Sequence, residues 1–172
     1  MKKIFLILST VALMFSTQTT TAQDNSMDIV DIAVSVDDFS TLVSALKAAD
    51  LVTALQGDGP FTVFAPVNAG FAKIDTNTLN SLLAPENKEK LSAILTYHVV
   101  AGKVDAAAVG AALEAGNGKA ELTTLNGATL TAVAKDGGIY LMDQSGNYSK
   151  IAKTDVMASN GVIHIIEDVV MP

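Results

Sequence analysis

His98 and His164 are the two histidines of the chain, and each could serve as a general base, a metal ligand or a buried structural group. Nucleophilic catalysis would need one of them beside a Ser, Thr or Cys and a carboxylate that orients the ring. The chain has no cysteine and no G-x-S-x-G elbow, and Ser145 and Ser159 occur in the segments DQSGN and ASNG, whose composition is typical of turns. We therefore expect no catalytic residue and no enzymatic activity.

Metal ligands are also few. Zinc would need three or four ligands, but the two histidines lie in separate β-type segments, without an H-E-x-x-H motif or a cysteine. Asp143, Ser145 and Asn147 have the alternate spacing of oxygen ligands at the start of a calcium loop. However, Tyr148 stands where such a loop needs glycine, and Thr154 occupies its last ligand position. A hairpin turn is the favoured interpretation, and we expect no metal and no cofactor.

The first part of the chain has mainly helical patterning. Apolar residues recur at helical spacing in the segments 29–36, 39–46, 79–83 and 91–95. Asp37 and Asp38 are placed to cap the second of these helices, and Pro85 is placed to open the fourth. We expect four or five short helices here, with one buried strand within residues 57–66.

The second part of the chain changes to strand patterning. After a helical turn at 106–112, short β-type runs alternate with turn signals such as Asn126-Gly127 and Asn160-Gly161. The expected strands are residues 96–100, 120–125, 129–134, 139–142, 148–156 and 162–170. Helices followed by hairpins indicate an α+β domain with antiparallel strands rather than a parallel βαβ fold.

The N-terminus has the composition of a secretory signal. Lys2 and Lys3 precede an apolar run from Ile4 to Phe15, and small polar residues lead to Ala22, the expected last residue of the leader. The apolar run is too short to span a bilayer, so we expect residues 1–22 to be removed and no stable membrane insertion. The chain that follows is long enough for one ordinary domain, here assigned to residues 27–172. Extracellular and periplasmic locations both fit this export signal.

Charge narrows the class of partner. Two of the 11 basic residues lie in the leader, so nine basic residues face 18 acidic ones in the mature chain. Every basic residue is a lysine, and bidentate arginine contacts to phosphate or guanine are therefore absent. An acidic surface repels nucleic acid and anionic lipid, and we discount both as partners.

Four segments, in order, resemble the successive motifs of the fasciclin domain family: DIVDIAVSVDDFSTLVSALKAADLV, GPFTVFAPVNAGFAKID, LTYHVVAGKV and ASNGVIHIIEDVVMP. Together they cover nearly all of residues 27–172. The resemblance implies a wedge of antiparallel strands, similar to a β-sandwich, with several short helices packed on one side. It also implies a secreted or surface-attached, non-enzymatic protein associated with cell adhesion and extracellular matrix contacts.

The segment YHVV supplies the first candidate partner-binding residues. Tyr97 and His98 resemble the Tyr-His pair implicated in adhesion in animal members of the family, and Val99 and Val100 match the branched apolar residues that flank it. The competing interpretation makes His98 a buried hydrogen-bonding residue, since buried polar groups are rarely left unpaired. The family resemblance places Asn68 near the Tyr-His pair, so Asn68 is the expected partner of the ring.

A second candidate site lies before the last motif. Asp155, Val156 and Met157 resemble the Asp-Ile-Met core of a short integrin-recognition motif. Lys153 and Thr154 replace the residues that usually precede that core, which weakens the case for integrin recognition. The alternative is that Asp155 simply ends a strand.

Other positions depart from the family pattern or have structural explanations. Val67 stands where the family usually has threonine, Gly70 where it usually has alanine, and Ala101 where proline commonly follows the Tyr-His segment. His164 alternates with its isoleucine neighbours in the last strand, so we expect it to be structural.

Two functional hypotheses follow. The first is a secreted, monomeric, non-enzymatic protein that mediates cell adhesion or matrix and biofilm interactions through an extracellular protein or polysaccharide. The second is a carrier of an apolar small molecule such as a carotenoid, because some fasciclin-like proteins carry pigments. Met142 and Met157 could line an adaptable groove for such a ligand, although core packing also explains them.

Overall fold

The structure is a computed structural model that describes residues 26–172, so the predicted leader over residues 1–22 lies outside the described residues. The helices are α1 (Ile29–Ser35), α2 (Ser40–Ala48), α3 (Val52–Leu55), α4 (Asn68–Phe71), α5 (Thr76–Leu83), α6 (Lys88–Tyr97) and α7 (Ala106–Ala115), with 3₁₀ turns η1 (Asp37–Phe39) and η2 (Pro85–Asn87). The helices before His98 are more numerous than expected, because α3 and α4 have only four residues each and carry no periodic stripe. Within residues 26–172, no helix has the length and apolarity needed to cross a membrane.

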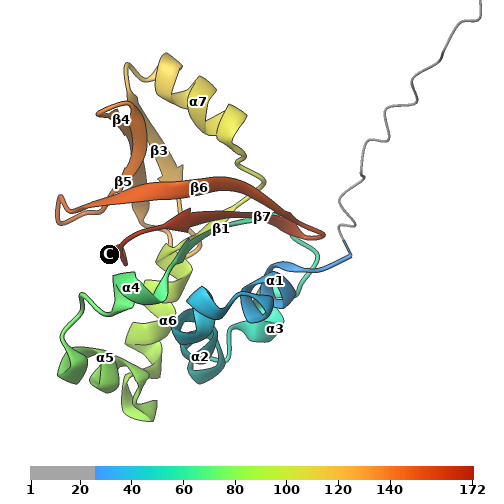
Figure 1. Cartoon of the computed structure of the whole chain (residues 1–172), viewed down its shortest axis with the longest axis vertical. Coiled ribbons are helices and arrows are strands. Elements are labelled where there is room, and N and C mark those ends of the chain that lie inside the picture. Colours follow the sequence, from blue (N-terminus) through green and yellow to red (C-terminus); the bar gives the residue numbers. More distant parts are fainter. Residues whose placement is uncertain (1–25) are drawn as a thin grey trace, which may run out of the picture.

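Seven strands form one sheet beside these helices (Figure 1). The strands are β1 (Phe61–Pro66), β2 (Val99–Ala101), β3 (Lys119–Thr123), β4 (Thr129–Lys135), β5 (Gly138–Met142), β6 (Tyr148–Ala158) and β7 (Gly161–Ile166). The expected segments all contain strands, but two of them are shorter than predicted: α6 continues to Tyr97, and β7 ends at Ile166. The α+β class is confirmed.

The order of strands in the sheet is β2-β1-β7-β6-β5-β4-β3. β1 and β7 run parallel, from Phe61 opposite Gly161 to Pro66 opposite Ile166, and the other pairs are antiparallel. The sheet is therefore mixed, and the expectation of purely antiparallel strands is wrong at this pair. An isolated bridge between Val100 and Thr124 links the two edge strands, so the sheet is nearly closed into a barrel.

The central strands are buried on both faces and separate two apolar clusters. We call the cluster enclosed by the sheet the interior core; it includes Phe64, Leu130, Leu141 and Ile166. The other cluster, the helical core, lies between the sheet and helices α1, α2 and α6. Because side chains alternate along a strand, Val63 and Ala65 enter the helical core while Phe64 enters the interior core.

Helix starts follow local capping rules in most cases. Asp28 forms a capping box with Asp31 at α1, Asp75 accepts from two amides of α5, and Asp105 accepts from the amide of Ala108 in α7. Pro85 opens the turn that leads into α6, as predicted. The prediction that Asp37 and Asp38 cap the second helix is wrong: they lie within η1, and α2 begins without a side-chain cap.

Candidate functional site

The segment YHVV lies where α6 meets β2, and it is buried throughout. Tyr97 ends the helix and His98 is its C-cap, while Val99 and Val100 begin β2. The exposed fractions are 0% for Tyr97, 2% for His98 and 3% for each valine. The proposed adhesion residues of this segment therefore form no contact surface in this conformation, because packing on both sides of the strand covers them.

Tyr97 and His98 enter different cores although they are adjacent. Tyr97 belongs to the interior core, where its hydroxyl donates to the carbonyl oxygen of Thr129 at 3.0 Å. Burial raises the pKa of Tyr97, with a further contribution from the nearby carboxylate of Asp143. His98 instead faces the helices and the end of the chain.

Both ring nitrogens of His98 have backbone partners. Nδ1 lies 2.8 Å from the carbonyl oxygen of Ile94, and Nε2 accepts from the amide of Val170 at 3.2 Å. A carbonyl partner requires a proton on Nδ1 and an amide partner requires a free electron pair on Nε2, so the ring is neutral in one tautomer. Burial lowers the pKa of His98 to about 4, against a smaller raising contribution from the Ile94 carbonyl. This geometry is that of an architectural histidine.

Asn68 does not bond to His98, so that predicted contact is wrong. Its amide nitrogen donates to the carbonyl oxygen of Asp37 and to Ser40 Oγ, both at 2.9 Å, and its side-chain oxygen accepts from the amide of Thr41 at 3.0 Å. Asn68 thus holds α4 against the η1–α2 turn. The expected contact came from the family resemblance, and the observed partners of Asn68 lie in η1 and α2 instead.

The residues after β7 form a segment that we call the C-terminal strap (residues 167–172). Successive amides of the strap bond to different elements: Glu167 to the carbonyl of Lys150, Asp168 to Ser149 Oγ, Val170 to His98, and Met171 to Asp143 Oδ2. The prediction of a strand through Val170 fails here because only Glu167 bonds to the backbone of β6, and the amides of Asp168, Val170 and Met171 bond to side chains instead.

Asp143 anchors the strap and its own hairpin. It is 4% exposed, and its Oδ1 accepts from the amide of Asn147 at 2.8 Å while Oδ2 accepts from Met171 at 3.3 Å. The segment considered for calcium is therefore a hairpin turn whose carboxylate binds backbone amides. Residues 26–172 contain no group of three or more acidic, His or Cys side chains arranged to hold a metal.

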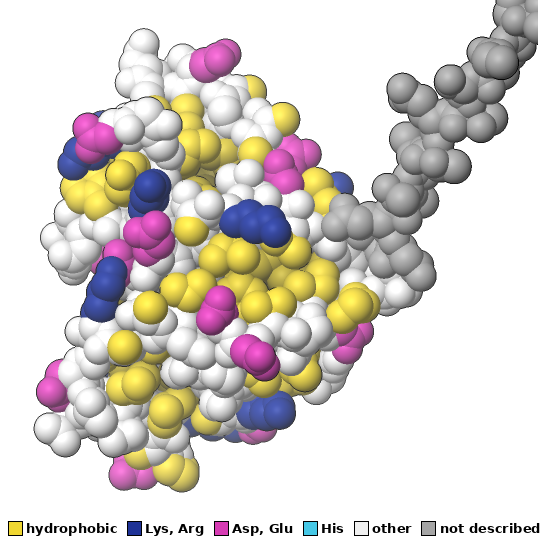
Figure 2. Space-filling model, in the orientation of Figure 1, with side chains coloured by type: hydrophobic (Ala, Val, Ile, Leu, Met, Phe, Trp, Pro, Cys, Tyr) yellow, Lys and Arg dark blue, Asp and Glu magenta, His cyan; other side chains and the backbone are white. Residues whose placement is uncertain are grey.

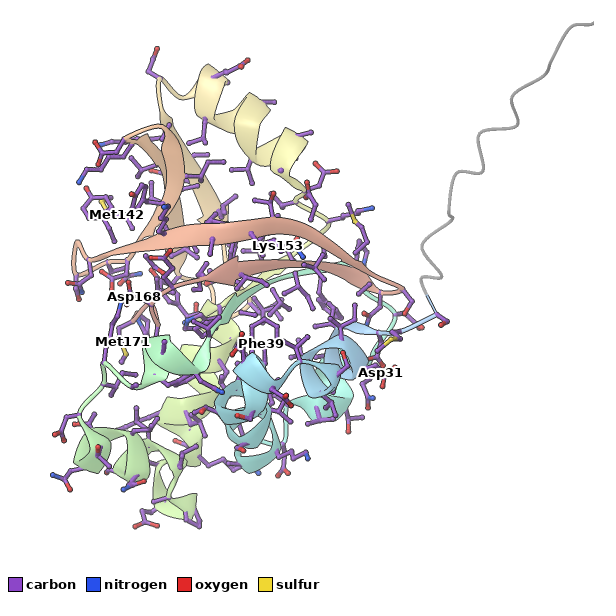
Figure 3. All side chains as sticks on the ribbon, in the orientation of Figure 1. Asp31, Phe39, Met142, Lys153, Asp168 and Met171 are labelled. Carbon is purple, nitrogen blue, oxygen red and sulfur yellow. The ribbon has the colours of Figure 1, made fainter. Side chains whose placement is uncertain are left out.

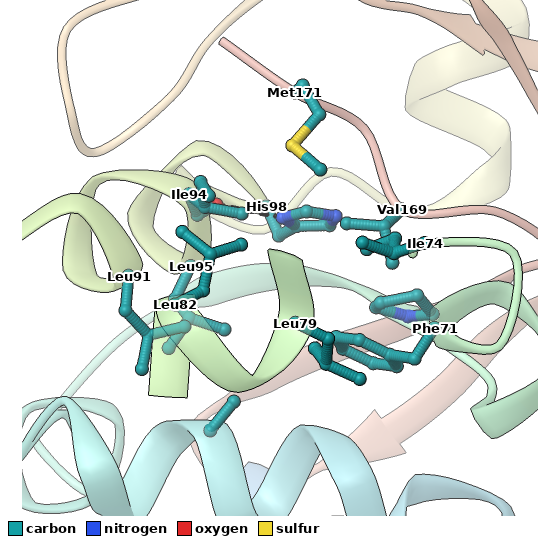
Figure 4. A pocket seen from close by; sticks show the side chains of 12 residues that line it. Phe71, Ile74, Leu79, Leu82, Leu91, Ile94, Leu95, His98, Val169 and Met171 are labelled. Carbon is teal, nitrogen blue, oxygen red and sulfur yellow. Dashed lines mark hydrogen bonds between the residues drawn. The ribbon is translucent and has the colours of Figure 1, made fainter. Parts of the chain in front are cut away.

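An apolar hollow of about 20 Å³ lies beside His98, under α5 and the strap (Figure 4). Its walls include Phe71, Leu79, Leu91 and Met171, and His98 is the one titratable side chain among the lining residues. The free volume is that of about one water molecule, too small for a drug-sized ligand without movement of a wall. α5 is the loosest wall, since none of its residues is fully buried.

Asp155 is a structural residue at a bulge of β6. Its backbone has φ of 58°, a left-handed conformation that is uncommon for residues other than glycine, and the pairing of β6 with β7 shifts between Lys153 and Val156. Its Oδ1 accepts from the amide of Ala106 at 2.8 Å, at the start of α7. Asp155, Val156 and Met157 are all half-buried, so each of the three presents some surface.

His164 is fully buried in the sheet. Its Nε2 lies 2.7 Å from the carbonyl oxygen of Val104, its Nδ1 accepts from the amide of Asp155 at 3.4 Å, and its ring stacks on Phe64 with centroids 5.4 Å apart. It therefore ties the loop before α7 and the β6 bulge to the centre of the sheet.

One exposed face carries a group of apolar side chains that the sequence did not identify (Figure 2). We call it the central patch; its members are partly exposed and pack on the helical core: Ile32, Val36, Val67, Val156 and Ile165. Figure 3, in the same orientation, places Lys153 over β6 and β7 and Asp31 on α1, at opposite borders of the patch. The residues come from four separate segments, so only the fold assembles them.

Comparison with known proteins identifies the family. The chain matches the fasciclin domain over residues 37–172 and belongs to that family. Protein sll1483 of a Synechocystis strain is 50% identical over 151 residues, which cover 88% of this chain and 77% of that protein. Immunogenic protein MPB70 of Mycobacterium bovis is 33% identical over 161 residues, which cover 87% of this chain and 72% of that protein.

Animal proteins and a solved structure are also similar. Transforming growth factor-beta-induced protein ig-h3 of Sus scrofa is 36% identical over 152 residues, covering 88% of this chain but only 20% of that protein. The structure of a FAS1 domain pair from the insect cell adhesion molecule Fasciclin I aligns with a TM-score of 0.52 at 21% identity, covering 74% of this chain and 40% of that one. This likeness shows the fold.

Proposed function

We propose that the protein is a secreted, non-enzymatic adhesion protein that binds an extracellular protein or polysaccharide through the central patch. Membership of the fasciclin domain family and the fold shared with an insect cell adhesion molecule support this class. The observation that carries the assignment of the surface is the apolar patch itself, with Lys153 and Asp31 at its borders (Figures 2 and 3). Contiguous exposed apolar groups with a polar rim are typical of protein contact sites.

Substitution of the patch tests this proposal. A double variant, Val156→Thr with Ile165→Thr, removes apolar surface while keeping the branched shape of the side chains. In a pull-down from intact cells and their secreted matrix, we expect about tenfold weaker binding, which corresponds to about 1.4 kcal/mol. If the wild-type protein binds neither fraction, the proposal of adhesion is wrong. If the double variant binds as well as the wild type, the central patch is not the contact surface.

Two control variants sharpen this test. Val34 is 58% exposed and lies two residues from Ile32 on α1, about 200° around the helix, so Val34→Thr should leave binding unchanged. His98→Ala should lower stability but not binding at equal folded concentration, because its ring is 2% exposed. If His98→Ala loses binding while its thermal unfolding is unchanged, the Tyr-His segment is the contact site after all.

A second candidate function is transport of an apolar small molecule such as a carotenoid. The supporting observation is the apolar hollow under α5, which would have to open to admit such a ligand. Visible absorption of the protein purified from its own source tests this candidate: a bound chromophore supports it, and a colourless protein without extractable lipid opposes it.

A further inference from the structure

Two buried acceptors hold the strap, and the side chain of Val170 packs in the interior core. Val170 donates to Nε2 of His98, which is 2% exposed, and Met171 donates to the carboxylate of Asp143, which is 4% exposed. The side chains of Val169 and Met171, in the same segment, line the apolar hollow (Figure 4). The strap thus covers apolar surface, and its hydrogen bond to Nε2 of His98 depends on the protonation state of that ring.

The bond to His98 is compatible with only one state of the ring. Nδ1 keeps its proton toward the Ile94 carbonyl at 2.8 Å, so an added proton can go only to Nε2. Nε2–H would then face Val170 N–H across the present 3.2 Å, donor against donor. Protonation therefore replaces an attractive contact by a repulsive one at the centre of the strap.

Few charged groups surround this contact. The lining from α2, β1, α4, α5 and α6 is apolar, and the pKa of His98 is set by burial and by the Ile94 carbonyl rather than by a charged neighbour. Tyr97 and Asp143 lie on the interior side, and Lys73 pairs with Asp168 at the start of the strap.

We propose that the C-terminal strap is an acid-released cover: proton uptake at Nε2 of His98 detaches Val170, and the strap swings away to expose the apolar hollow while the sheet stays folded. This device goes beyond adhesion and does not depend on it. If the hollow takes an apolar ligand, the strap regulates access to it.

The size of the response follows from proton linkage. Burial holds the pKa of His98 at about 4, whereas a released, solvated ring would return to its ordinary value of 6.5. The equilibrium constant for opening then rises about 100-fold as pH falls from 6.5 to 4, because the full tenfold change per pH unit applies only between the two pKa values and not at either end.

Site-resolved hydrogen exchange of the full chain, measured by NMR between pH 6.5 and pH 4 and corrected for intrinsic rates, tests the proposal. We expect the protection of the Val170 amide to fall about 100-fold. The amide of Phe64, which donates to the carbonyl of His98 at 2.8 Å, should keep its protection and serves as the internal reference. Constant protection of Val170, or simultaneous loss at Val170 and Phe64, would overturn the proposal.

Matched histidine variants separate the strap from general acid effects. His98→Gln should abolish most of the pH dependence at Val170, while His164→Gln, at an equally buried ring without contact to the strap, should retain it. Fluorescence of anilinonaphthalene sulfonate should rise with acid in wild type and His164→Gln only. If His98→Gln does not fold, the wild-type comparison of Val170 with Phe64 still decides the question.

Discussion

The interior core and the helical side of the molecule are packed to different degrees. Leu130, Leu141 and Ile166 in the interior core are 0% exposed, and strands together with α7 surround them. On the helical side, α5 has no fully buried residue, and a hollow remains between it and His98. A nearly closed sheet fixes its neighbours through many backbone hydrogen bonds, whereas α5 is held by its packing and by the side chain of Asn87 on Ser81. The two sides should therefore respond differently to the same perturbation.

The largest contrast should come from leucine truncation. Leu141→Ala leaves a cavity that the strands cannot fill, and we expect a loss of about 4 kcal/mol in the free energy of unfolding. Leu82→Ala on α5 removes a half-buried side chain beside existing free space, and a loss of about 1 kcal/mol is expected. Urea unfolding of both variants gives the comparison, and equal losses would show that the helical side is as tightly fixed as the interior.

The second-largest effect should be a loss in the free energy of unfolding at acid pH, caused by His98 on the helical side. The folded pKa of His98, about 4, is below its ordinary 6.5, so the unfolded chain binds more protons between these values and stability falls as pH falls through this window. The full loss attributable to His98 is about 3 kcal/mol, and it is complete below pH 4.

Urea midpoints at pH 7 and pH 4, for wild type and for His98→Gln, measure this contribution. The carboxylates titrate in both proteins, so the difference between their pH dependences isolates the ring. An identical pH dependence in the two proteins would exclude His98 as the source.

Much of the fold was predictable because its determinants are local. Apolar residues at helical spacing, Pro85, the turn signals and strand alternation predicted most elements, whereas the caps predicted at Asp37 and Asp38 did not form. Two features of the fold could not be predicted from short stretches of sequence. The parallel pairing of β1 with β7 joins segments about 100 residues apart, and four-residue helices such as α3 carry too few residues to show a period.

The candidate site was predictable only in part, because burial depends on the whole fold. The motif YHVV was found from sequence, but the interior core and the helices cover it from both sides. Asp143 was considered as a calcium ligand. One of its partners, Asn147, is local, but the other, Met171, is 28 residues away and gives no local signal. The central patch likewise combines residues from α1, β6 and β7 that share no motif.

Gly70 offers a smaller test of how closely the two regions approach. A methyl group at this position would lie 2.7 Å from the carbonyl oxygen of Glu167, the first residue of the strap. The expected cost of Gly70→Ala is about 2 kcal/mol, since backbone must move to relieve the clash. Gly110→Ala, where a methyl group meets nothing within 4 Å, is the matched control and should not destabilise the protein. Thermal unfolding of both variants measures this difference. If Gly70→Ala has the same unfolding midpoint as the wild type, the strap moves aside without loss of stability.

The smallest effect is expected at the ion pair between Lys73 and Asp168, where the strap begins. The side chains are 62% and 31% exposed, so solvent screens their attraction. Lys73→Ala should cost about 0.5 kcal/mol or less in the free energy of unfolding. It should also leave the acid response of Val170 unchanged, since the buried bond to His98 rather than the surface charge holds that amide. If Lys73→Ala instead released Val170 at pH 7, the ion pair would be the fastening of the strap, and the difference between the two regions would lie in surface charge instead of packing.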